Sequence, residues 1–214
     1  MAKQTAFGVK IDVSEVEDFA AKLGGMSPAS IGALLVGAIN DATDSAYELA
    51  RKTMLGGINL TDTYVRSRMQ VEHATVGKPE ATITAFGDKA HLTGLSHYGA
   101  MMQTRAVQHP GRSRGDPARG IPPGQKSAGV SVEVIKGKRE SFSHGFFMPG
   151  KIDSEGNPLV FARKKGTNKI VSRRGPAVYM LFRVAAGAVE DQVYGDLQQR
   201  VVAEAERQFQ KEFQ

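Results

Sequence analysis

The side chains in this sequence whose type and spacing most clearly indicate a binding role are cations, and they are concentrated in its middle. Residues 100–175 hold fifteen of the 28 Lys and Arg residues but only five of the 22 acidic residues, so this segment carries +10. The remaining 13 bases and 17 acids give the rest of the chain −4. A flexible basic segment attracts polyanions. It therefore indicates contact with a polyanion or with an acidic protein surface, and the alternative is a solvated loop that only keeps the protein soluble.

We expect the contact to be made by clusters of bases that stand in loops and at strand ends. Bases in loops and at strand ends of a small sheet are more easily placed together along one rim of the sheet than at scattered positions. A rim of bases repeated around a ring would line a channel for DNA without reading its sequence. The predicted DNA-lumen or docking residues are Arg105, Arg112, Arg114, Arg119, Lys126, Lys138, Arg139, Arg163, Lys164, Lys165, Arg173 and Arg174.

Metal and thiol chemistry find little support in the sequence. The chain has no cysteine, which excludes disulfides, thiolate ligands and cysteine nucleophiles. Its histidines fit no known ligand spacing, so we expect ordinary surface or partly buried side chains and no metal site. These histidines are His73, His91, His97, His109 and His144.

Nucleotide binding and catalysis are not expected either. The run 120–127 resembles a phosphate-binding loop, but Gln125 stands where such a loop needs glycine before Lys126, and two prolines remove backbone donors. No Gly-x-Ser-x-Gly elbow occurs, and the adjacent Ser96 and His97 do not form a catalytic geometry. We therefore predict a protein that is not an enzyme and has no cofactor.

Acidic residues gather near the start of the chain. They favour a solvated helix face over the paired carboxylates of a metal-dependent nuclease. They are Asp12, Glu15, Glu17 and Asp18.

Helical patterns stand near both ends of the chain. Ser27 and Pro28 predict the start of a long amphipathic helix that ends at Gly56 and Gly57. A shorter helix or turn is expected at 13–23, and Thr61 and Asp62 predict the cap of another short helix. The last element is predicted from a four-residue ladder of apolar positions: Val189, Val193, Leu197, Val201, Ala205, Phe209 and Phe213.

Alternating apolar and polar residues between these helices predict strands. One hairpin is expected over 69–73 and 81–85, with its turn at 77–80. Further strands are predicted at 130–137, 146–148 and 159–163, with a short edge strand at 169–171. The fold class is thus α+β: a long N-terminal helix packed on a small antiparallel sheet, an extended basic loop and a C-terminal helix.

Residues 99–129 are expected to form that extended basic loop within a single domain over 1–214. They show no periodic signal, which is uncommon for a segment of this length inside a compact domain. Since they contain little apolar surface, we expect a partner to order them.

The order of these features resembles the minor tail protein Z family of long-tailed phages. The resemblance rests on a helix followed by a pattern that starts at Leu60, a strand ending in Phe-x-Arg at 161–163, and a Gly-Pro joint at 175–176. It covers residues 28–212. The pattern after the helix comprises Leu60, Thr61, Tyr64, Val65, Arg66 and Arg68.

The resemblance implies a virion structural protein of the neck that completes the tail and joins it to the head. Its implied partners are copies of itself in a homohexameric ring, the tail tube protein, a head–tail connector or stopper protein, and double-stranded DNA in the lumen. We expect the protein to be assembled in the bacterial host cytoplasm and to have no membrane partner. The alternative function is a non-specific nucleic-acid-binding protein that uses the basic loop.

Overall fold

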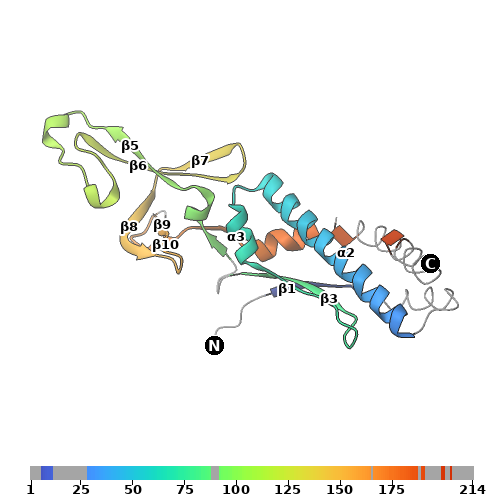
Figure 1. Ribbon diagram of the computed structural model, residues 1–214. Helices are drawn as coiled ribbons and strands as arrows, with labels where there is room; N and C mark the ends of the chain where they lie inside the picture. Colours follow the sequence, from blue (N-terminus) through green and yellow to red (C-terminus); the bar gives the residue numbers. More distant parts are fainter. Residues whose placement is uncertain are drawn as a thin grey trace. The chain divides into compact units, whose positions relative to one another are not determined.

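The computed structural model describes residues 6–11, 28–87, 92–164, 166–187, 189–190, 199–200 and 203. Its helices and antiparallel strands confirm the predicted mixture of α and β structure (Figure 1). The chain divides into two compact units. The first unit comprises Met1–Met54, Val65–Gly87 and Val178–Gln214, and the second comprises Leu55–Tyr64 and Asp88–Ala177. The expectation of a single domain over 1–214 stays a prediction.

Helix α2 (Pro28–Gly57) is the long helix that the apolar stripe predicts, and it supplies much of the core of the first unit. Many of its buried side chains are alanines, which allow neighbouring backbone to approach closely. The buried apolar positions of α2 are Leu34, Leu35, Ala38, Ile39, Ala42, Ala46, Ala50 and Met54. The short helix α3 (Asp62–Ser67) follows as predicted, and the Tyr64 amide donates a hydrogen bond to Thr61 Oγ1 over 3.3 Å.

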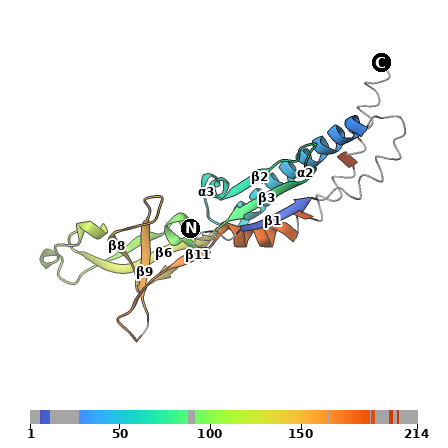
Figure 2. The ribbon, with the colours of Figure 1, turned by 90° about the horizontal axis from the view of Figure 1, so that it is seen from below.

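The sheet of the first unit has the order β1-β3-β2 and is antiparallel throughout (Figure 2). Its strands are β1 (Ala6–Ile11), β2 (Met69–Glu72) and β3 (Ala81–Phe86). The β2–β3 hairpin confirms the prediction, and on β3 the residues Ala81, Ile83 and Ala85 are buried in alternation. Strand β1 was not predicted.

Asn40 ties α2 to the end of this hairpin. Its side-chain amide donates to the Ala74 carbonyl over 3.2 Å, and its side-chain oxygen accepts from the Ala74 amide over 2.7 Å. The Asn40 side chain thereby satisfies both backbone hydrogen-bonding groups of Ala74, as a neighbouring strand would. Nearby, the buried Thr43 hydroxyl donates to the Ile39 carbonyl over 2.7 Å, so this polar group is also satisfied.

A second helical stretch in the first unit covers residues 178–187 and 189–190. It buries Phe182, Ala185 and Ala186. It begins before the predicted ladder, most of which, from Val193 to Phe213, lies outside the described residues. The predicted helix or turn at 13–23 also lies outside them.

The second unit contains three small antiparallel sheets, with the orders β5-β6-β7, β10-β9-β8 and β11-β4. The strands are β4 (Leu92–Gly94), β5 (Met101–Ala106), β6 (Gln125–Ile135), β7 (Lys138–Phe142), β8 (Gly145–Ile152), β9 (Pro158–Arg163), β10 (Ile170–Ser172) and β11 (Arg174–Pro176). Strands β6, β8, β9 and the edge strand β10 correspond to predictions, whereas β4, β5, β7 and β11 do not.

Tyr98 lies at the centre of this unit. It belongs to the short helix η1 (Leu95–Tyr98) and is completely buried. Its hydroxyl donates a hydrogen bond to the Pro176 carbonyl, and the Asn59 side chain donates to the Tyr98 carbonyl over 3.4 Å. Three segments that are distant in the sequence therefore meet at one tyrosine.

The prediction that residues 99–129 form an extended basic loop was wrong at both ends of that segment, where β5 and the start of β6 lie. Strand β5 pairs with the start of β6, and the connection between them contains two single-turn helices, η2 (Pro110–Arg112) and η3 (Pro117–Arg119). The amides of Asp116 and Ile121 each donate to the other residue's carbonyl, over 2.8 and 2.9 Å. Backbone pairing thus holds the segment together, and Ile121 is buried within it.

Candidate functional site

The predicted basic residues all belong to the second unit, where strand pairing sorts them into separate groups. The first group stands on β5, β6 and their connection. Arg105 on β5 lies opposite Lys126 on β6 in the strand register, and both side chains are exposed. Like charges placed opposite each other in a sheet repel, so this pair favours an anionic partner. Arg114 is also exposed, and Arg112 lies in η2.

Two of the predicted cations have acidic neighbours along the chain. Arg119 forms an ion pair with Asp116 over 3.3 Å, and Lys138 forms one with Glu140 over 3.3 Å. These four side chains are all well exposed, so each pair contributes little stability.

Arg139 has a structural role that its residue type did not reveal. Its guanidinium donates to the Gly99 carbonyl and to Ser131 Oγ, each over 3.3 Å, and lies 3.5 Å from a Glu133 carboxylate oxygen. The side chain of a β7 residue thus binds the neighbouring strand β6 and the chain beside η1. Its charge is largely engaged inside the unit.

A further group lies at the β9–β10 turn. Arg163 ends β9 and Lys164 follows it; both are exposed, whereas Lys165 lies outside the described residues. Arg105, Arg114, Lys126, Arg163, Lys164 and Arg173 form no ion pair with an acid among the residues that the structure describes. A role in contacting DNA or another subunit stays a prediction for all twelve residues.

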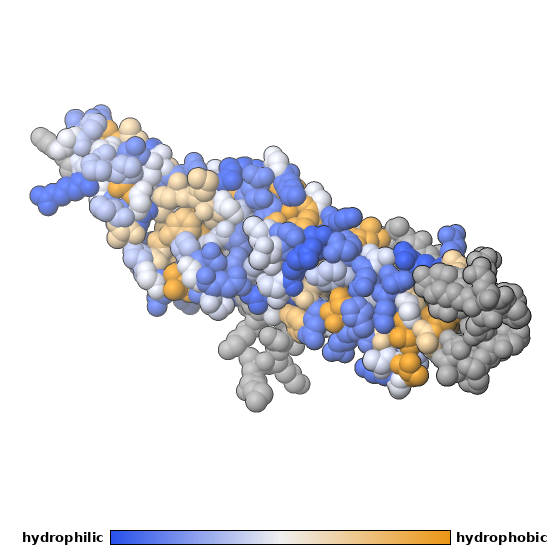
Figure 3. All heavy atoms as spheres, viewed as in Figure 1, coloured by the Kyte–Doolittle hydropathy of each residue, from blue (hydrophilic) through white to orange (hydrophobic). Residues whose placement is uncertain are grey.

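A pocket of about 370 Å³ lies in the same unit, lined by residues of η1, β6, β7 and the chain around β11. Its walls are mostly apolar: Leu95, Val132, Val134, Ile135, Phe142 and Pro176. Its charged lining residues are Lys138, Glu140, Arg173 and Arg174. On the face drawn in Figure 3, the part of this unit that carries β5 to β9 shows an apolar patch among hydrophilic side chains.

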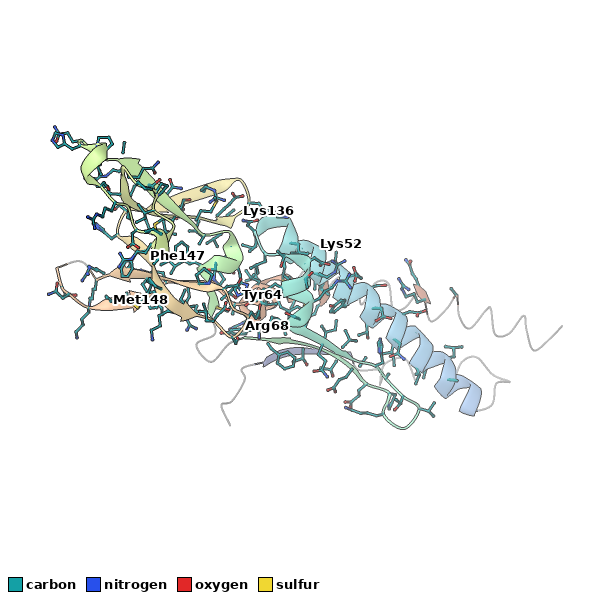
Figure 4. The ribbon with its side chains drawn as sticks, turned by 60° about the vertical axis from the view of Figure 1, so that its left-hand side comes forward. Lys52, Tyr64, Arg68, Lys136, Phe147 and Met148 are labelled. Carbon is teal, nitrogen blue, oxygen red and sulfur yellow. The ribbon has the colours of Figure 1, made fainter. Side chains whose placement is uncertain are left out.

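Of these lining residues, the prediction identified only the three cations Lys138, Arg173 and Arg174. The apolar walls come from segments that lie far apart in the sequence, and no local pattern marks them. Figure 4 shows Lys136 at the turn between β6 and β7, close in sequence to the exposed Ile135, and shows Phe147 and Met148 on β8. The combination of an apolar wall and a cationic rim suits protein contact more than catalysis.

His97 is partly buried and paired, as expected of a structural histidine. Its Nε2 lies 2.9 Å from Asp153 Oδ2 and 4.0 Å from Glu155 Oε2, and its ring centre lies 4.1 Å from that of Tyr64. The other Asp153 oxygen accepts from the backbone amides of Glu155 and Asn157, over 2.9 and 2.8 Å. One carboxylate therefore holds the β8–β9 turn closed and fixes it to η1.

We expect replacement of Asp153 by alanine to lower the free energy of unfolding by about 2 kcal/mol, because hydrogen bonds to a charged acceptor are lost. Partial burial raises the pKa of the Asp153 carboxyl, but the amides of Asn157 and Glu155, His97 and the Asn157 side chain outweigh it, and the pKa is lowered. This contribution is present above the ordinary pKa and is lost as the pH falls below about 4. Urea unfolding between pH 3 and pH 7 measures it. Equal pH dependence in the variant and the wild type would contradict the assignment.

We expect replacement of Tyr98 by phenylalanine to change the response to alkaline pH. Burial raises the pKa of Tyr98 far above its ordinary value, so the fold requires the neutral phenol. Its contribution is complete below about pH 10 and is lost as the pH rises from there towards the raised pKa. The variant should lose about 1 kcal/mol at pH 7, because the Pro176 carbonyl loses its donor, and should then fall less steeply than the wild type above pH 10. Chemical unfolding at pH 7 to 11 tests both parts.

The described residues offer exposed cations and an apolar pocket that suit contact with a partner. Among them, no group of three or more His, Asp or Glu side chains could hold a metal ion, and no helix is long and apolar enough to cross a membrane. A folded body that carries exposed cations, a basic hairpin-like excursion and an apolar pocket is typical of a structural or assembly protein.

The family comparison gives that class a specific identity. The chain belongs to the family of prophage minor tail protein Z (GPZ), whose model matches residues 16–214. This confirms the resemblance, and it makes the chain a structural protein of a phage tail and a component of the virion. No curated protein and no solved structure matches the chain.

Proposed function

We propose that this tail protein acts in the neck, where it completes the tail and joins it to the head connector as part of a ring around the DNA channel. It has no enzymatic role and is assembled in the host cytoplasm. Its partners are other copies of itself in a homohexamer, the tail tube protein and a head–tail connector or stopper protein. Double-stranded DNA passes through the lumen.

The observation that carries the proposal is the exposed cationic surface of β5, β6 and their connection. Arg105 and Lys126 lie opposite each other, and Arg114 stands nearby in sequence on the connection. None of the three forms an ion pair among the described residues. Unpaired cations on an ordered excursion are suited to phosphates, which need charge at the backbone and no base-specific groups.

Native mass spectrometry tests the ring, with a closed oligomer as the expected result. A strictly monomeric protein over the whole concentration range, in the presence and absence of tails, would contradict it. Negative-stain microscopy of tails labelled through this protein then tests its position, because a neck component must lie at the head-proximal end.

The alternative, a free nucleic-acid-binding protein, is separated by the salt dependence of DNA binding. We expect the triple variant Arg105→Ala, Arg114→Ala, Lys126→Ala to reduce the slope of log K against log salt concentration by roughly 3, since each phosphate contact contributes about 0.9. The matched control removes three exposed cations of the first unit: Lys52, drawn in Figure 4, Lys78 and Arg183. Tight DNA binding by an isolated monomer would favour the alternative function.

A further inference from the structure

The pocket in the second unit has the chemistry of a docking site for an acidic, partly apolar segment. Its walls are apolar, and Ile135 stands at 51% exposure. Three cations and one acid line it, which gives a net charge of 3 − 1 = +2. Lys138 and Glu140 pair with each other, and Arg173, which forms no ion pair with an acid among the described residues, adds positive charge to the lining.

The chain itself contains a segment of the complementary kind. Residues 12–19 read DVSEVEDF, with four acids, no base and three apolar residues interleaved. The segment therefore carries −4 against the +2 of the pocket, and it offers Val13, Val16 and Phe19 as anchors for the apolar walls. It lies outside the described residues.

We propose that the acidic segment 12–19 of one copy docks into the pocket of a second copy. Segment and pocket are different surfaces of the same chain, so the contact is head-to-tail, and such a contact forms a ring where the rotation between copies closes. This inference rests on the proposed function, because it identifies the subunit contact of that ring. DNA is the poorer occupant, since phosphates gain nothing from the apolar walls.

A charge swap in the full-length chain tests the contact directly. The segment variant carries Glu15→Lys, Glu17→Lys and Asp18→Lys, and the pocket variant carries Lys138→Glu and Arg173→Glu. Each variant alone places like charges in contact and should remain monomeric in native mass spectrometry. A mixture of the two places opposite charges at every contact, and it should assemble into oligomers in which the variants alternate. The expected gain in assembled protein on mixing is at least ten-fold.

The control variant carries Lys151→Glu and Lys169→Glu, which reverse two exposed cations of the same unit that neither line the pocket nor belong to the predicted contact residues. It should assemble like the wild type. If the segment variant and the pocket variant each form the same ring as the wild type, the proposed docking contact is contradicted and the proposed ring is not. If mixing restores nothing, docking between copies is also wrong.

A peptide of residues 10–23 tests docking without requiring a ring. Fluorescence anisotropy should show binding to the full chain, at least ten-fold weaker binding to Ile135→Glu, and unchanged binding to Ile152→Glu, a residue of similar exposure outside the pocket. If the peptide binds to a wild-type protein that remains monomeric, the docking proposal is supported and the proposed ring is contradicted. Equal peptide binding by both isoleucine variants, or loss of DNA binding as the only effect of Ile135→Glu, would overturn the proposal.

Discussion

Replacement of Gly129 by alanine is expected to cost the second unit about 3 kcal/mol or more, and to unfold much of it at moderate temperature. Gly129 has a φ of +111°, a conformation that residues with a side chain rarely adopt. A Cβ at this position would also overlap the Phe142 carbonyl oxygen and lie 2.7 Å from Ser143 Cα. Both obstacles are backbone, so β6 and the end of β7 would have to separate.

Gly137 provides the matched control for this prediction. Its φ is +77°, but no atom lies within 4 Å of the place where a Cβ would stand. Alanine there bears only the conformational cost, about 1 kcal/mol. Thermal unfolding of the two variants measures the difference, and equal losses of stability would show that the close approach of β7 is unimportant.

Replacement of Gly175 by alanine is expected to have the second large effect, also about 3 kcal/mol. The added Cβ would lie 2.5 Å from Cε2 and 3.0 Å from Cδ2 of Tyr98. The Tyr98 ring has no room to withdraw, because it is fully buried and its hydroxyl is bonded to the Pro176 carbonyl. Overpacking at such a place disrupts β11 and the pocket that it lines.

A double-mutant cycle separates this clash from a general loss of stability. Tyr98→Leu alone should be destabilising, but Gly175→Ala should cost much less in the Tyr98→Leu background than in the wild type. Gly111→Ala is the control substitution, because no atom lies within 4 Å of its Cβ position. Fully additive effects of the Tyr98 and Gly175 substitutions would contradict the proposed contact.

The elements that sequence predicts well here are those held by their own apolar pattern. Helix α2 follows a stripe of buried positions, and β3 alternates buried and half-buried residues. Strand β5 was missed because most of its side chains are exposed, so its pairing with β6 leaves no hydrophobic alternation to detect. Strands β4 and β11 have three residues each and stabilise each other although about eighty residues separate them in the sequence. A pattern read over a few neighbouring residues therefore cannot predict them.

The candidate site divides in the same way. Residue type and charge density were enough to find the cations, but the strand pairing distributes them over separate groups in the second unit, and their role in contact stays a prediction. Type alone could not show that Arg139 is engaged with Gly99 and Glu133 inside the unit. Nor could it show the pocket, which forms only when η1, β6, β7 and β11 come together.

The pairing of β4 with β11 has a consequence for how this protein can vary. Leu92–Gly94 and Arg174–Pro176 are antiparallel neighbours, so the long excursion between them leaves and returns at adjacent points of the backbone. An insertion whose two ends meet can be lengthened, shortened or exchanged while the chain before and after it keeps its connections. The first unit can therefore stay constant while the segment that carries the exposed cations and much of the pocket lining changes in length or sequence.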